Sequence, residues 1–378
     1  MRVISVFNNK GGVGKTTLMY NTAHALATLG KKVLVIDCDP QCNLSLNFLS
    51  EDFLESIWLV EEPFIMEGYQ KTREKSNNGY SSVLSEPRSL HFILKPTEEG
   101  IDDPTEIPEP VRINDNLHLI PGRLTMYLFE DFVSKRWNDL YSGTPLAIRT
   151  VTKIRKLCKM MSDNYNYDYV LIDTSPSLGA LNKVIISFAD DFIIPCNPDK
   201  FSLYGIKNIG SSMTQWFRDI NIVYSLLSDS KRCEFPDEYV RFIGFCIYKA
   251  KKYSSSQNPW LLAQGHYSLA QQIPDYIRNY ICNTEMPTID MEVLREPIGG
   301  TSVMYYDNTH PSLSQQFHVP MWEIPAKFEE QATEEMFIDN QEFNRMKSSV
   351  GGNRRVYEGK LSAYQEFAND LIVRLEIT

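Results

Sequence analysis

The 378-residue sequence has no long hydrophobic run: nothing approaches the roughly 18 consecutive apolar residues that a membrane-spanning helix requires. It also lacks an N-terminal segment with a charged start, an apolar centre and a cleavage site. No export signal is therefore expected, and the predicted location is the cytoplasm. The seven cysteines include no C-x-x-C pair, which favours reduced thiols over a disulfide framework.

Positive charge is also scarce. Lys and Arg number 38 against 48 Asp and Glu, which gives a net charge of −10. A protein whose main task is to coat DNA is usually basic, so this balance argues against that class, although a local basic patch stays open. Hydrophobic residues at 43% and charged residues at 23% are typical of a soluble globular protein.

The clearest functional signal lies near the N-terminus. Residues 2–8 are mostly β-branched and apolar, which predicts a buried parallel strand. The run KGGVGKTT follows at 10–17, and the apolar spacing after it predicts a helix that ends near Gly30. A strand, a glycine loop and a helix form the context of a phosphate-binding loop, because glycines admit the phosphates and a helix N-terminus attracts anions. Lys15 would bind the β- and γ-phosphates, and the Thr16 hydroxyl would reach Mg²⁺.

Two further apolar strands end in aspartate. VLVIDCDPQCN places Asp37 and Asp39 at the end of one, and YVLIDTSPSLG places Asp173 at the end of the other. Carboxylates at such strand ends can bind Mg²⁺, directly or through water. A lone aspartate there is as often a helix N-cap, but the phosphate loop favours the metal role for Asp173. Cys38 and Cys42 do not indicate a metal site, since no histidine lies near them.

These motifs resemble those of the ParA/MinD and nitrogenase-iron-protein class of P-loop ATPases. Its deviant phosphate loop reads K-G-G-x-G-K-[ST]-T, and here Asn9 stands where the standard pattern has Gly. The resemblance implies an α/β fold with a doubly wound, mostly parallel sheet and helices on both faces. Further segments that resemble motifs of this class lie at 37–43, 113–124, 169–179, 190–205, 241–249 and 286–307. We expect a single domain over residues 1–378, with insertions at about 51–110, 225–240 and 308–360.

The resemblance also implies site roles, with ATP and Mg²⁺ as cofactors. Lys10 would cross the interface of an ATP-dependent homodimer to the partner's nucleotide, Asp39 would orient the attacking water, and Pro287 would lie near the adenine. Cys42 replaces a family glycine, and its small side chain is expected to be tolerated. The implied catalytic residues are Lys10, Lys15 and Asp39. The implied nucleotide-binding residues are Lys10, Gly11, Gly12, Val13, Gly14, Lys15, Thr16, Thr17 and Pro287. The implied metal residues are Thr16, Asp37, Asp39 and Asp173.

The branches of this class perform different tasks, so the remaining residues must discriminate among them. No cysteine closely follows Asp173, which disfavours the iron–sulfur branch, and the absent C-x-x-C clasp disfavours tail-anchor targeting. The amphipathic stretch at 364–375 has an acidic polar face, so it is expected to pack on the sheet and not on a membrane.

DNA binding in the partition branch relies partly on arginines in the late segment. Thr288 replaces the first of them, and Met-Glu-Val at 291–293 occupies the neighbourhood of the second, which argues against DNA binding. Basic runs at 153–159, 249–252 and 353–355 keep it open.

Together, these residues and the family resemblance imply a Mg²⁺-ATP-dependent dimerising switch ATPase of ParA type. It would partition or position DNA or another cargo with a protein partner that stimulates hydrolysis. The alternative is an ATP switch within a plasmid-maintenance or phage-defence system that does not coat DNA. A metabolic ATP-dependent ligase of the same fold is a third hypothesis, which the D-P-Q-x-N run at 39–43 disfavours.

Overall fold

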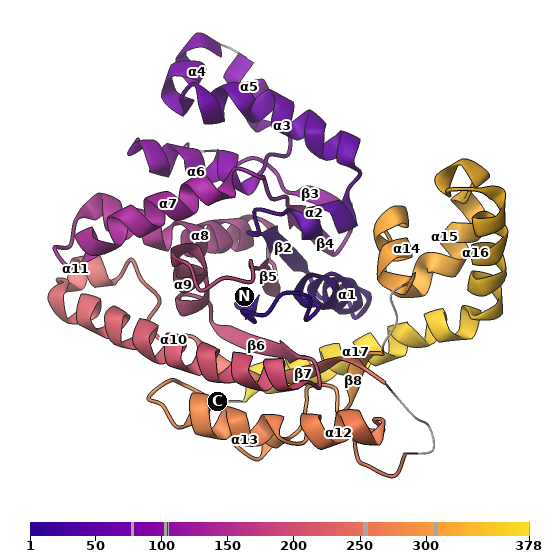
Figure 1. The fold of residues 1–378 in the computed structure, drawn as a ribbon. Coiled ribbons are helices and arrows are strands. Elements are labelled where there is room, and N and C mark those ends of the chain that lie inside the picture. The colour runs from indigo at the N-terminus through magenta and orange to yellow at the C-terminus, as the bar shows by residue number, and fades with distance from the viewer. Residues whose placement is uncertain (77–78, 102–103, 105, 252–255, 306–308, 378) are drawn as a thin grey trace.

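The computed structural model describes residues 1–378 except 77–78, 102–103, 105, 252–255, 306–308 and 378. Within the described residues, eight strands form one sheet (Figure 1). The strands are β1 (Arg2–Val6), β2 (Val33–Asp37), β3 (Val111–Asn114), β4 (Leu117–Ile120), β5 (Tyr169–Asp173), β6 (Asp191–Cys196), β7 (Arg241–Ala250) and β8 (Ser302–Tyr305).

The sheet order is β3-β4-β2-β5-β1-β6-β7-β8, and every neighbouring pair is parallel except β3 and β4. The central strands are fully buried, as in β2 (VLVID) and β5 (YVLID), because helices cover both faces of the sheet. From β1 the chain moves in one direction to β2, whereas from β5 it moves in the other direction to β6. Because such crossovers are right-handed, this reversal places their helices on opposite faces. The doubly wound α/β fold predicted from the sequence is confirmed.

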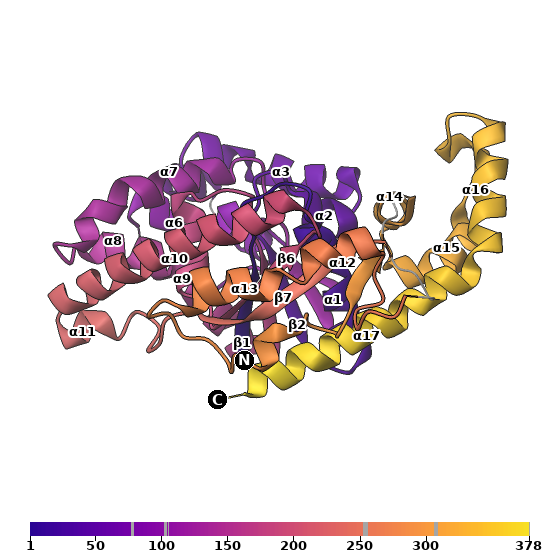
Figure 2. The same ribbon diagram turned by 60° about the horizontal axis from the view of Figure 1, so that its bottom comes forward.

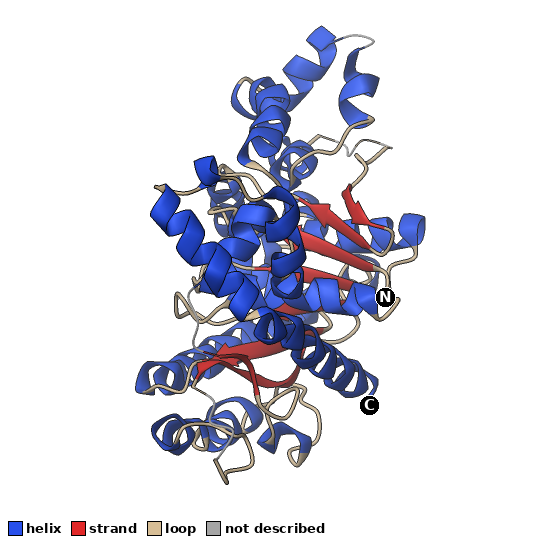
Figure 3. Ribbon diagram, turned by 90° about the vertical axis from the view of Figure 1, so that its right-hand side faces the viewer, coloured by secondary structure: helices blue, strands red, loops and turns tan. Residues whose placement is uncertain are grey.

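The helices divide accordingly between two layers (Figures 1 and 3). On one face, α1 (Lys15–Thr28) packs against α17 (Arg354–Glu376). On the other, α9 (Ala180–Ser187) packs between α8 (Pro145–Tyr165) and α10 (Lys200–Leu226). The apolar stripe predicted within 364–375 is buried in α17, which confirms that this stretch packs on the protein; its members are Tyr364, Phe367, Ala368, Leu371 and Leu375.

The predicted insertion at 51–110 is helical and projects beyond the β3 edge of the sheet, at the top of Figure 1. Ser50 caps its first helix, since its hydroxyl accepts a hydrogen bond from Phe53 N. A small apolar cluster separate from the main core holds the insertion together; it contains Phe64, Tyr69, Leu84 and Phe92. The helices are α3 (Glu51–Met66), α4 (Tyr69–Ser76), α5 (Gly79–Leu84) and α6 (Leu90–Glu99).

The predicted insertions at 225–240 and 308–360 also contain helices within their described residues. The first holds the end of α10 and the short α11 (Asp229–Arg232). The second leaves the sheet beside α17 and reaches away from it, as Figure 2 shows for α16. Its helices are α14 (Thr309–Phe317), α15 (Ile324–Gln331) and α16 (Asn340–Gly352), and the other helices of the fold are α2 (Asn43–Phe48), α7 (Met126–Trp137), α12 (Gln264–Ala270) and α13 (Ile273–Ile277). Among the described residues, no helix is both long and apolar enough to cross a bilayer.

Candidate functional site

The phosphate loop lies between β1 and α1, in the predicted strand–loop–helix context. Gly12 and Gly14 have φ angles of 73° and 80°, which non-glycine residues rarely adopt. A Cβ on Gly14 would also lie 1.9 Å from the Tyr248 ring. Glycine is therefore required at position 14 by both backbone conformation and space. Val13 is fully buried, so its side chain belongs to the core.

Two side chains of α1 meet the acidic strand ends. The Lys15 ammonium is almost fully buried and donates to the Asn8 carbonyl oxygen at 2.9 Å. Burial lowers the pKa of Lys15, and the charges of Asp173 and Asp39 oppose that shift. Thr16 Oγ1 donates to Asp173 Oδ2 at 2.9 Å. The first turn of α1 therefore brings one cation and one hydroxyl to the aspartates.

The strand register brings the aspartates together. Asp37 and Asp173 are paired residues of β2 and β5, and Val6 at the end of β1 pairs with Asp173. Burial raises the pKa of Asp37 to about 6, although hydrogen bonds from Ser45 oppose the shift. Burial and repulsion from Asp37 raise the pKa of Asp173 to about 8. A buried carboxylate is stabilised by a cation, and oxygen ligands suit Mg²⁺, so Asp173 with the Thr16 hydroxyl fits that ion.

Asp37 and Asp39 use their carboxylates differently. Asp37 accepts from Asp39 N at 3.1 Å, and from Ser45 N and Oγ at 2.8 and 2.6 Å, so it holds the segment 38–45 in place. Asp39 accepts from Gln41 N at 2.9 Å and lines the cleft beside the phosphate loop. Of the two aspartates, Asp39 is thus the one that lines the cleft.

The cleft itself has a volume of about 450 Å³, within the usual range for small-molecule sites. Sequence reasoning missed a further part of the cleft lining, which consists of Tyr248 and Lys249 near the end of β7 and three residues of α14. Their only sequence signal was the position of 248–249 at the carboxyl end of a predicted strand, where α/β folds bind ligands. The lining residues are Gly11, Gly12, Gly14, Lys15, Thr16, Thr17, Asp39, Gln41, Asn43, Asn47, Pro176, Tyr248, Lys249, Pro311, Ser312 and Gln315.

Lys10 points to the start of α10. Its ammonium lies 2.6 Å from Asp199 Oδ2 and 5.8 Å from the centre of the Phe201 ring. Asp199 also caps α10, since its Oδ1 accepts from Ser202 N at 2.8 Å. The Lys10 ammonium is therefore held by a carboxylate of its own chain.

The structure does not bring Pro287 to the cleft. Its carbonyl oxygen accepts from Phe242 N at 2.9 Å, near the first residue of β7. The cleft residue Tyr248 lies six positions further along that strand, which corresponds to roughly 20 Å at about 3.3 Å per residue. Pro287 therefore lies toward the amino end of the sheet, away from the phosphate loop, and this placement does not support a contact with the adenine.

Comparison with known proteins places these features in a family. Residues 1–223 match the family model described as an AAA domain. An uncharacterized protein of Methanocaldococcus jannaschii is 33% identical over 55% of this chain and 63% of its own length. The chromosome partitioning protein ParA of Caulobacter vibrioides is 27% identical over 55% of this chain and 61% of its own. The chain thus spans about three fifths of these relatives.

A solved structure extends the similarity further along the chain. Protein DIP2308 from Corynebacterium diphtheriae superposes with a TM-score of 0.58 at 26% identity, covering 76% of this chain and 91% of its own. The likeness therefore reaches beyond the segment that the family model matches.

Proposed function

This chain belongs to the ParA/MinD-type P-loop ATPases, and we propose that it is a Mg²⁺-ATP-dependent dimerising switch that hydrolyses ATP to control assembly with a partner. The observation that carries the proposal is one cleft in which the phosphate loop, the Thr16–Asp173 pair and Asp39 meet. A nucleotide triphosphate and a hard divalent cation match that set of groups.

The residues divide the work of binding. The N–H groups of the loop and Lys15 would hold the phosphates at the N-terminus of α1. Thr16, Asp39 and Asp173 would hold Mg²⁺, directly or through water, while Asp37 keeps the 38–45 segment in position. When bound, Mg²⁺ would neutralise charge on the phosphate oxygens.

Hydrolysis would depend on Asp39, whose carboxylate can orient a water molecule toward the terminal phosphate. Gln41 N fixes one oxygen of that carboxylate at 2.9 Å. The reaction is expected to be slow in the isolated protein and faster with a protein partner. Its products would release the dimer.

Dimerisation would depend on Lys10, which would leave Asp199 and reach the nucleotide of the second protomer. The test compares Lys10→Ala with Lys15→Ala by sedimentation and by ATP affinity. Lys10→Ala should bind ATP and stay monomeric, whereas Lys15→Ala should lose ATP affinity by roughly 10- to 150-fold, the effect of one charge-assisted hydrogen bond. ATP-dependent dimers of Lys10→Ala would refute the role of Lys10.

The cargo separates two candidates. Partition or positioning of DNA is the first. The second, an ATP switch in a plasmid-maintenance or phage-defence system without a DNA coat, is favoured by ion pairs that several residues of the predicted basic runs make within the chain. Arg155 pairs with Asp190 and Lys156 with Glu234, while Arg354 pairs with Glu329 and Glu358. In the run at 249–252, Lys252 lies outside the described residues.

DNA binding measured with ATP over a range of salt concentrations separates the candidates. Affinity that falls steeply with salt supports the partition role, since phosphate contacts release counterions. Absence of binding at low salt supports the second candidate. A small-molecule product without an ATP-dependent dimer would instead indicate the ligase hypothesis.

A further inference from the structure

A second cavity, of about 350 Å³, lies on the helical insertion and shares no lining residue with the nucleotide cleft. One wall is a single face of α3, since its residues follow the spacing i, i+3, i+4, i+7 and i+11. The other wall is the segment after β4. The residues of this α3 groove are Glu55, Trp58, Leu59, Glu62, Met66, Arg123, Leu124 and Thr125.

The α3 groove presents apolar side chains to solvent. Leu59 is 74% exposed, Met66 56% and Leu124 54%, and the half-buried Trp58 ring lies among the lining residues. Single exposed leucines are ordinary on protein surfaces, but several around one hollow are typical of an interaction site.

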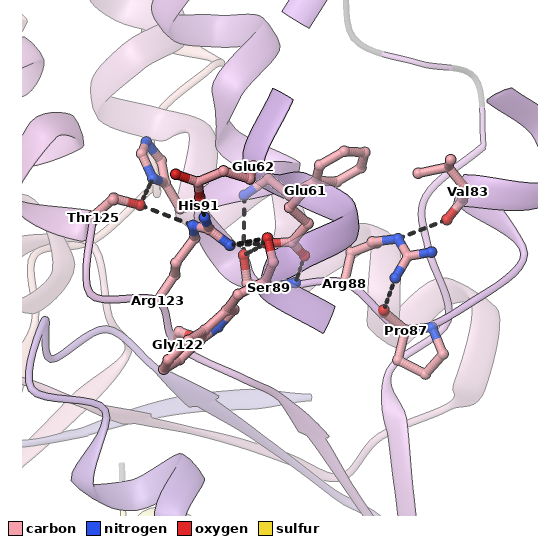
Figure 4. Close-up of polar contacts among 12 residues, drawn as sticks. Glu61, Glu62, Val83, Pro87, Arg88, Ser89, His91, Gly122, Arg123 and Thr125 are labelled. Carbon is pink, nitrogen blue, oxygen red and sulfur yellow. Dashed lines mark hydrogen bonds and ion pairs between the residues drawn. The ribbon is translucent and has the colours of Figure 1, made fainter. Parts of the chain in front are cut away.

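The charged residues of α3 all have one sign. The sequence of α3, EDFLESIWLVEEPFIM, contains five acidic residues and neither Lys nor Arg. The one cation of the groove, Arg123, is already neutralised, because it pairs with Glu61 at 3.1 Å and with Glu62 (Figure 4). Glu61 also accepts from Ser89 N and Oγ, at 2.6 Å each. The exposed acids Glu51, Asp52 and Glu55 therefore make the start of α3 negative, while Lys71 and Lys75 at its other end pair with Glu67.

We propose that the α3 groove docks an amphipathic helix with a basic flank, contributed by a partner protein. Its apolar side chains would fill the hollow between α3 and Leu124, and its Lys or Arg residues would face Glu55 and the first turn of α3. A second copy of this chain is a poorer occupant, because a two-fold contact would bring two acidic faces together.

The groove is connected to the nucleotide site by hydrogen bonds. Trp58 Nε1 donates to the Gly122 carbonyl oxygen at 3.1 Å, and Gly122 N donates to Ser45 Oγ at 2.8 Å. Ser45 Oγ in turn donates to Asp37 Oδ2 at 2.6 Å. Asp37 holds the backbone of Asp39, so a helix that shifts Trp58 would also shift the catalytic segment. This coupling rests on the proposed ATPase function, whereas docking does not.

Docking is tested on the full chain without nucleotide. The probe is a fluorescein-labelled 18-residue peptide of Leu and Lys in amphipathic helical order, and its affinity is measured by anisotropy. The controls are the same peptide with Glu for Lys, and a scrambled Leu/Lys sequence. We expect the ordered Leu/Lys peptide to bind at least about tenfold more tightly than either control.

Matched variants locate the binding site. Leu59→Asp should weaken the Leu/Lys peptide about tenfold or more, whereas Leu226→Asp, at a 57% exposed leucine of α10, should not. Likewise Glu55→Lys should weaken it and Glu366→Lys, on the exposed side of α17, should not. Equal effects within each pair would indicate attraction to the acidic protein as a whole and would overturn the proposal. If the peptide bound neither the wild type nor the variants, and Leu59→Asp abolished the ATP-dependent dimer, the groove would be a contact between two copies of the chain. That result would also overturn the docking proposal.

Coupling is tested by measuring peptide affinity with and without ATP, and ATP affinity with and without peptide. The two factors must be equal, and we expect about fivefold or more in the wild type. Ser45→Ala should reduce the coupling factor to about one and leave peptide binding without nucleotide intact. Trp58→Phe keeps an apolar ring but loses the Nε1 donor, so it breaks the same series of hydrogen bonds at a second point. Unchanged coupling in both variants would overturn the connection. If the wild-type protein did not hydrolyse ATP, that result by itself would refute the proposed function but not the docking proposal.

Discussion

The ammonium of Lys10 lies 2.6 Å from the carboxylate of Asp199, and this salt bridge ties the phosphate loop to the start of α10. Both side chains are partly exposed, so the bridge is expected to contribute only about 0.2–1 kcal/mol. That energy opposes any state in which Lys10 contacts a second protomer. The contact therefore predicts a measurable restraint on dimerisation.

Asp199→Asn should release Lys10 and favour the ATP-dependent dimer. Asparagine caps helices as well as aspartate does, so α10 should keep its start. Two bridges break per dimer, and the dimerisation Kd is expected to fall by roughly 2- to 30-fold in sedimentation with ATP. In the Lys10→Ala background the same substitution should have no effect. An unchanged Kd in the wild-type background would contradict the restraint.

Asp39→Ala should separate binding from hydrolysis. The side chain lines the cleft, and within the described part of the chain its carboxylate accepts a single hydrogen bond, from the nearby Gln41 N, so it supports no other element. We expect hydrolysis to slow by roughly 10²- to 10⁴-fold while ATP still binds and dimers persist. Phosphate release and sedimentation measure the two properties. A variant that loses ATP binding to the same degree as hydrolysis would show that Asp39 serves mainly as a ligand of the bound nucleotide.

The core of the site was predictable because it is local in sequence. A strand followed by KGGVGKTT leaves few alternatives to a phosphate loop, and apolar strands fix where Asp37 and Asp173 end. The parallel register then determines that these aspartates meet. The chemistry of this half of the site thus follows from short motifs and the rules of parallel sheets.

The rest of the site depends on contacts between distant segments, which carry no local motif. Asp199 is 189 residues from Lys10 in the sequence. The helix α14 contributes to the cleft lining, but the sequence predicted only an insertion in its segment. Pro287 shows the opposite case. Its family-like segment is present, but hydrogen bonding to Phe242 places it toward the wrong end of β7. The helical packing of 51–110 likewise arises from its own small core, which composition did not reveal.

Cys42 shows the cost of replacing the family glycine. Its φ is 54°, in the left-handed region, and its side chain is fully buried before α2. Removing the Cβ should relieve about 1 kcal/mol of backbone strain. We therefore expect Cys42→Gly to be more stable than Cys42→Ala by about 1 kcal/mol in urea unfolding, the reverse of the order in a regular helix. If Ala were the more stable, the backbone at position 42 would not be strained.

His24 should make stability depend on pH. It is buried among Tyr20, Phe48 and Trp322, and its Nε2 has no hydrogen-bond partner within the described part of the chain. Burial lowers the pKa of His24 from the ordinary 6.5 to about 3. As the pH falls, His24 therefore binds a proton in the unfolded chain before it does so in the folded protein. The contribution of neutral His24 to the free energy of unfolding is present above pH 6.5 and is lost as the pH falls below it. Between pH 7.5 and 5 this single group should cost about 2 kcal/mol of unfolding free energy.

Substitution isolates that contribution from the other titrating groups. His24→Phe keeps an aromatic ring but cannot bind a proton, and His24→Gln is a second neutral choice if the larger ring does not fit. The free energy of unfolding, measured in urea at pH 7.5 and at pH 5, should fall about 2 kcal/mol less in these variants than in the wild type. The difference arises because only wild-type His24 gains a proton on unfolding at pH 5. An equal loss in wild type and variants would mean that His24 accepts its proton inside the folded protein.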